Sequence, residues 1–123
     1  MRRWEQFVSM AALSVIVGGA VYAYNRERLA DTDLNPEFQD INQKYFDGHL
    51  SEVRAEWGQL TDEFGETHKF QGGQFVIVLD RNENTSLDSV RKTLKHESCH
   101  VSVDWKEPEE HGAMFQRCMR RFD

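Results

Sequence analysis

The segment His96-Glu97-Ser98-Cys99-His100 has the pattern H-E-x-x-H. In a helix, side chains four residues apart lie on the same face, so the imidazoles of His96 and His100 can reach one metal ion. Glu97 lies between them in the sequence and can accept a proton from a water at that metal. Because this chemistry requires a helix, the residues around the motif decide how it is interpreted.

The residues before the motif predict a helix. Thr85 or Ser86 can cap its N-terminus, and Asp88 in the first turn complements the helix dipole. Apolar residues then recur at intervals of three, four and seven, which is the spacing of one helical face, at Leu87, Val90, Leu94 and Val101. We therefore expect a helix that buries this face and presents His96 and His100 from another.

A third histidine, His111, follows eleven residues after His100. Catalytic zinc sites use three protein ligands and leave a fourth position for water. The break at residues 106–108 lets the chain turn, so that a second helix can pack against the first. We interpret His96, His100 and His111 as the ligands of one Zn²⁺ per chain and Glu97 as the catalytic residue. The alternative is three surface or core histidines without a metal.

Composition and charge restrict the class of partner. The chain has 123 residues, of which 39% are hydrophobic and 29% are charged, as expected for one small domain. Its net charge is −6, and residues 1–30 carry four arginines and two glutamates, so the remainder carries −8. A domain this acidic lacks the basic surface of nucleic-acid-binding proteins. We expect no nucleic-acid partner.

Residues 7–24 form an apolar stretch in which only Ser9 and Ser14 are plainly polar. Eighteen helical residues span about 27 Å, which is close to the hydrocarbon thickness of a bilayer. Aromatic residues that suit the two membrane interfaces stand near its ends, at Trp4, Tyr22 and Tyr24. The stretch is typical of a transmembrane helix.

We therefore expect two parts, an N-terminal membrane segment over residues 1–30 and a domain over residues 31–123. The anchor would contact the membrane through residues 4–25 and make the protein single-pass. A signal peptide cut after Ala23 is one alternative, which would make the domain secreted or periplasmic. A core helix of the domain is the other. Arginines flank the stretch on both sides, so the positive-inside rule leaves the orientation open.

The domain itself is predicted to be of the α+β class. Pro36 fits the first turn of a helix that Asn35 caps and that ends in a turn at Asp47-Gly48. A last helix follows His111, and its apolar residues are expected to pack on the motif helix: Met114, Phe115, Cys118, Met119 and Phe122.

Two strands are expected between the first helix and the motif helix. Residues 50–57 alternate as a half-buried strand, and residues 75–79 form a continuous β-rich run. Residues 60–70 are polar and are interpreted as a loop or a ragged hairpin. In a zincin-type arrangement, the edge of residues 75–79 could pair with an extended substrate peptide. His68, Tyr45 or a backbone N–H could stabilise the oxyanion.

The two cysteines, Cys99 and Cys118, are expected to be buried free thiols. If the domain is exported and the two helices pack together, a disulfide between them is the alternative.

The motifs together resemble the SprT-like (Spartan-type) zinc metallopeptidase domain. The resemblance covers about residues 34–122 and rests on H-E-x-x-H at residues 96–100 followed by H-G-x-x-F at residues 111–115, with supporting segments at Tyr45 to Leu50 and Trp57. It implies a small zincin-like fold, with His96, His100 and His111 as zinc ligands and Glu97 as the catalytic residue.

The resemblance also implies an activity, which is zinc-dependent hydrolysis of peptide bonds in a protein or peptide substrate. Together with the apolar N-terminal stretch, it predicts a membrane-tethered metalloendopeptidase. Three alternatives remain open. The first is a catalytically idle zinc-binding SprT-like module that acts as a membrane-anchored interaction protein. The second is an interaction protein that binds no metal. The third is another zinc hydrolase, such as a nuclease or an amidase.

Overall fold

The computed structural model describes residues 29–123, and the domain occupies the unit Asp33–Asp123. Its elements are helix α3 (Asn35–Phe46), strands β1 (Val53–Gly58), β2 (Gly65–Lys69) and β3 (Phe75–Asp80), helices α4 (Leu87–Val103) and α5 (Ala113–Met119), and the short 3-10 helix η2 (Arg120–Phe122). The prediction of a small α+β domain with a short mixed sheet is confirmed.

The predicted membrane segment over residues 4–25 lies outside the described residues, and so do its signal-peptide and core-helix alternatives. Among the helices of residues 29–123, none is long and apolar enough to cross a membrane.

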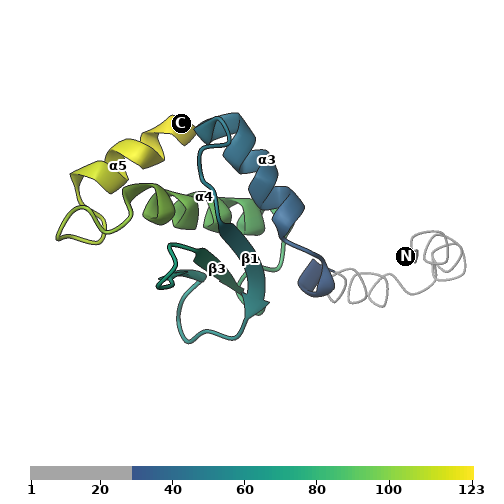
Figure 1. Ribbon diagram of the computed structural model, residues 1–123. Coiled ribbons are helices and arrows are strands. Elements are labelled where there is room, and N and C mark those ends of the chain that lie inside the picture. Colours follow the sequence, from purple (N-terminus) through teal and green to yellow (C-terminus); the bar gives the residue numbers. More distant parts are fainter. Residues whose placement is uncertain (1–28) are drawn as a thin grey trace, which may run out of the picture. The chain divides into compact units, whose positions relative to one another are not determined.

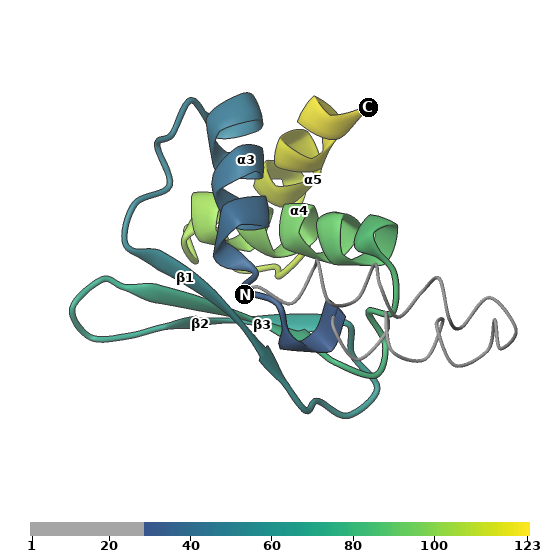
Figure 2. The same ribbon diagram turned by 90° about the vertical axis from the view of Figure 1, so that its right-hand side faces the viewer.

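The sheet has the strand order β1-β3-β2. Strand β1 runs parallel to β3, with Trp57 opposite Leu79, and β2 runs antiparallel to β3, with Thr67 opposite Ile77. The central strand β3 is buried on both faces, as its continuous apolar sequence indicates. Helices α3, α4 and α5 all lie on one side of the sheet (Figure 1 and Figure 2).

Two expectations about this sheet were wrong. Residues 65–69, within the predicted loop or ragged hairpin, form the regular edge strand β2. Its sequence, Gly-Glu-Thr-His-Lys, has no apolar alternation, so periodicity could not reveal it. The predicted free edge of residues 75–79 does not exist, because β3 is paired on both sides. The strand with an unpaired edge next to the motif helix is β2.

Two asparagine side chains tie helix α3 to strand β1 and to the loop before it. The amide of Asn35 pairs with both backbone groups of Ala55, donating to its carbonyl at 3.1 Å and accepting from its N–H at 3.0 Å. The amide of Asn42 pairs in the same way with Leu50, at 2.9 and 3.1 Å. The prediction that Asn35 caps α3 was wrong, since the N-cap is Leu34 and makes no side-chain cap bond.

Helix α4 begins as predicted. Ser86 is its N-cap, and the hydroxyl accepts from the N–H of Ser89 at 3.1 Å. Of the predicted apolar stripe, Val90, Leu94 and Val101 are buried in the core. Leu87, at the start of the helix, is 51% exposed and lies outside that core.

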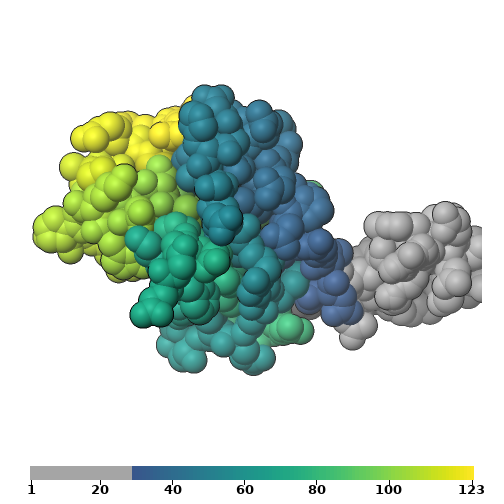
Figure 3. All heavy atoms as spheres, viewed as in Figure 1, coloured from purple at the N-terminus to yellow at the C-terminus, as the bar shows by residue number. Residues whose placement is uncertain are grey.

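The C-terminal segment returns to α3. Arg121 donates to the carbonyl oxygen of Tyr45 at 2.7 Å, and the ring of Phe122 meets the ring of Tyr45 edge-on at 4.8 Å. Figure 3 shows this yellow C-terminal segment in contact with the blue surface of α3. The first and last helices of the domain are therefore joined on its outer side.

A disulfide joins Cys99 of α4 to Cys118 of α5. Both residues are buried. The expectation of two free thiols was wrong, and the disulfide alternative is confirmed. The bridge closes a loop with a sequence separation of 19 residues, and this loop contains both His100 and His111.

We expect this disulfide to contribute about 3 kcal/mol to the free energy of unfolding, mainly because it restricts the unfolded chain. Urea unfolding of the oxidised and reduced full-length protein measures the difference. The double variant Cys99→Ala/Cys118→Ala is the control, because a reductant must not change its midpoint. Equal stability of oxidised and reduced protein would contradict the prediction.

Candidate metal centre

The structure brings the three motif histidines together. His96 and His100 extend from the same face of α4, and His111 comes from the loop before α5. One ring nitrogen from each lies within 4.8 Å of those from the other two. Two ligand positions thus follow from helix geometry, while the third depends on how α5 packs.

The ring of Phe115 packs against all three imidazole rings. Its ring centroid lies 4.9 Å from that of His96, 4.5 Å from that of His100 and 4.7 Å from that of His111. Phe115 is only 3% exposed. The sequence analysis assigned it to the packing face of the last helix, and the structure shows that the same ring also supports the imidazoles.

The two helix histidines, His96 and His100, are shifted toward the uncharged form that metal binding requires. Burial, followed by the neighbouring His100 and His111, lowers the pKa of His96 to about 4. Burial and then His111 also lower the pKa of His100. Near neutral pH, His96 and His100 therefore offer lone pairs rather than positive charges.

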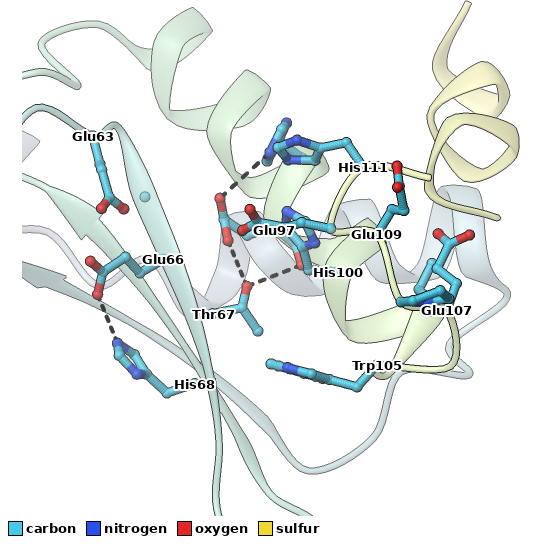
Figure 4. A pocket seen from close by; sticks show the side chains of 15 residues that line it. Glu63, Glu66, Thr67, His68, Glu97, His100, Trp105, Glu107, Glu109 and His111 are labelled. Atoms are coloured by element: carbon cyan, nitrogen blue, oxygen red, sulfur yellow. Dashed lines mark hydrogen bonds and ion pairs between the residues drawn. The ribbon is translucent and has the colours of Figure 1, made fainter. Parts of the chain in front are cut away.

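Glu97 is buried beside the histidines, with 5% of its surface exposed. The hydroxyl of Thr67, on β2, donates to its Oε1 at 2.6 Å, and its Oε2 lies 4.0 Å from Nε2 of His96. Figure 4 shows Thr67 and Glu97 pointing toward each other. Burial raises the pKa of Glu97 to about 7, while the Thr67 hydrogen bond lowers it. A carboxyl group with this pKa suits general acid–base chemistry near neutral pH.

The contact between β2 and α4 depends on Gly65. A Cβ atom at this position would lie 2.7 Å from Cγ2 of Thr93 and 3.2 Å from Cγ of Glu97. The absence of a side chain therefore lets β2 pass close enough for Thr67 to reach Glu97. Thr67 was not identified from the sequence, because its strand was interpreted as a loop.

These groups open into a cleft of about 800 Å³. Among the described residues that line it there is no lysine or arginine, and there are five glutamates besides Glu97: Glu63, Glu66, Glu107, Glu109 and Glu110. His68, one of the three oxyanion candidates, also lines the cleft and bonds to Glu66 at 2.9 Å. Tyr45 is not among the lining residues and packs against Phe122 instead.

The comparison with protein families agrees with this arrangement. The model of the SprT-like family matches residues 34–123. The chain belongs to the SprT-like family. No curated protein matches the chain. The SprT-like family usually has a domain of metallopeptidase type and is associated with zinc.

The donor set of this SprT-like domain fits a zinc ion. Three neutral imidazoles are a ligand set that zinc uses at catalytic sites, and such a set leaves a position free on the open side of the ion. The carboxylates of the cleft favour a cation, and no cationic side chain of the described residues lines it. His96, His100 and His111 are the residues that would hold the metal.

We expect the full-length protein to contain about one zinc per chain, and the His111→Ala variant to lose or strongly weaken its binding, because only two ligands remain. Elemental analysis after dialysis measures both. His68→Ala is the matched control, since it removes a histidine from the same cleft but outside the cluster, and it should keep its zinc. Equal zinc content in His111→Ala and the parent would exclude His111 as a ligand.

Proposed function

We propose that this protein is a zinc-dependent metalloendopeptidase that cuts protein or peptide substrates. The observation that supports it best is the buried carboxyl group of Glu97, held by Thr67 next to three converging imidazoles. A structural zinc site has no use for such a carboxylate. This argues against the alternative of a catalytically idle zinc-binding module.

The substrate has a place to bind along β2. The outer edge of this strand is unpaired within the described residues and borders the cleft. An extended peptide that adds to this edge would form main-chain hydrogen bonds and pass in front of His96 and Glu97. This geometry suits a peptide bond, and the acidic cleft disfavours nucleic acid.

Zinc, when bound, would supply Lewis acidity, which polarises the scissile carbonyl and lowers the pKa of water. Glu97 takes a proton from the attacking water as the oxygen adds to the carbonyl carbon. It then gives this proton to the amide nitrogen as the C–N bond breaks, so that a carboxylic acid and an amine are formed. Thr67 holds Oε1 of Glu97, and Oε2 is left to exchange the proton.

We also propose that the domain works outside the reducing cytosol, tethered to a membrane through residues 4–25. The apolar sequence of that segment supports a tether. The disulfide between Cys99 and Cys118 supports an oxidising compartment, because such bonds rarely persist in the cytosol of ordinary organisms. If the segment is cleaved instead, the domain would be secreted or periplasmic.

Replacing Glu97 by glutamine should leave zinc content unchanged and lower kcat by about 10²–10⁴-fold, because the amide cannot accept the proton. Cleavage of fluorescein-labelled casein by the zinc-loaded full-length protein measures the rate, and elemental analysis controls for metal loss. Unchanged cleavage by Glu97→Gln would remove Glu97 from the mechanism. A zinc-loaded parent that cuts no protein substrate would favour the idle module.

The Thr67→Val variant should lower kcat by about 10–100-fold with little change in KM, because one hydrogen bond to the carboxylate is lost. The Thr67→Ser variant keeps the hydroxyl and should restore most of the rate. The same casein assay at several substrate concentrations separates the two constants. If serine is as slow as valine, the hydroxyl does not position Glu97.

A further inference from the structure

Glu107 is a cleft residue that the proposed chemistry does not use. Its carboxylate accepts two backbone hydrogen bonds from the first turn of α5, from Met114 N to Oε1 at 2.9 Å and from Phe115 N to Oε2 at 3.0 Å. The N-cap of α5 is Gly112, which has no side chain to fill this role. Glu107 therefore caps α5 from across the loop.

Gly112 and Glu107 are sterically linked. A Cβ atom on Gly112 would lie 2.7 Å from Oε1 and 2.8 Å from Cδ of Glu107. The backbone of Gly112, with φ of −79°, is open to other residues, so the carboxylate is what requires a glycine here. The carboxylate could swing away from a larger residue, but it would then lose both hydrogen bonds to α5.

His111 lies between Glu107 and Gly112 in the sequence and immediately precedes Gly112. Unlike His96 and His100, it is not part of a helix, and its side chain is exposed. The far end of α5 is held to α4 by the disulfide at Cys118. At the near end, the Glu107 carboxylate joins the start of the loop to the helix that follows His111.

We propose that Glu107 is a positioning residue for the third metal ligand. Its carboxylate holds the loop over residues 107–112 closed, and it thereby holds His111 at the distance from His96 and His100 that one metal ion requires. This inference rests on the proposed zinc site. The residue acts through His111 and contacts neither the metal nor the substrate.

The test is the zinc affinity of the full-length protein, measured by competition with a chromogenic chelator. Glu107→Ala should raise the zinc Kd by about 10–100-fold, as the loss of a group that orients a ligand does. Glu107→Gln keeps one acceptor oxygen and should fall between this variant and the parent. Glu109→Gln is the matched control. It removes the same charge from the same cleft, and in the described structure the Glu109 side chain makes no hydrogen bond to α5.

Two further readouts separate positioning from a general loss of structure. The visible absorption of the cobalt-substituted protein reports ligand geometry, and it should change in Glu107→Ala but not in Glu109→Gln. Gly112→Ala should also raise the zinc Kd. This rise should be smaller in the Glu107→Ala background, where the carboxylate that the new methyl group would contact is gone. If Glu107→Ala does not fold, the zinc Kd and the cobalt spectrum of Glu107→Gln and of Gly112→Ala alone decide the question.

The outcomes are distinct. A parent protein that binds no zinc would overturn the proposed function and this inference together. A parent that binds zinc, with Glu107→Ala binding equally tightly and with the same cobalt spectrum, would overturn the inference alone. An equal rise in zinc Kd on Gly112→Ala in both backgrounds would also overturn the inference about Glu107.

Discussion

The candidate site depends on holding one ring nitrogen from each of three histidines within 4.8 Å of the other two. Two of them come from one helix and need only its regular geometry, but the third arrives on a loop. The structure meets this requirement with contacts around α5, namely the disulfide at Cys118, the ring of Phe115 beneath the imidazoles and the Glu107 carboxylate at the start of the helix. A seven-residue helix would be marginal by itself, so these tertiary contacts stabilise it.

The other side of the cleft is built by β2. Gly65 allows this strand to approach α4, and Thr67 uses the approach to reach Glu97. The two sides thus have different roles, with α5 supplying the third imidazole and its support and β2 orienting the carboxyl group and offering a free edge. Both sides meet at α4, which explains why the motif helix lies at the centre of the domain.

The errors of the sequence-based prediction have identifiable physical causes. Strand β2 is polar because it has a solvent-exposed edge, so no hydrophobic period revealed it. Asn35 looked like a helix cap because its side chain can bond to a backbone, and it does so with Ala55, twenty residues away. Cys99 and Cys118 looked like ordinary buried thiols because pairing depends on distance in space. The errors at Asn35 and at the two cysteines concern partners that are remote in the sequence, whereas the error at β2 comes from its polar sequence.

The sequence by itself determined the parts whose geometry is local. The spacing of His96 and His100 places both on one face of a helix, the β-rich run at residues 75–79 forms a buried strand, and Ser86 caps α4. Only the tertiary structure decided that His111 completes the cluster in space, that β2 rather than β3 borders the cleft, and that Thr67 and Glu107 support the site. The reason is that helix and strand periods extend over a few residues, whereas these contacts depend on how the whole chain packs.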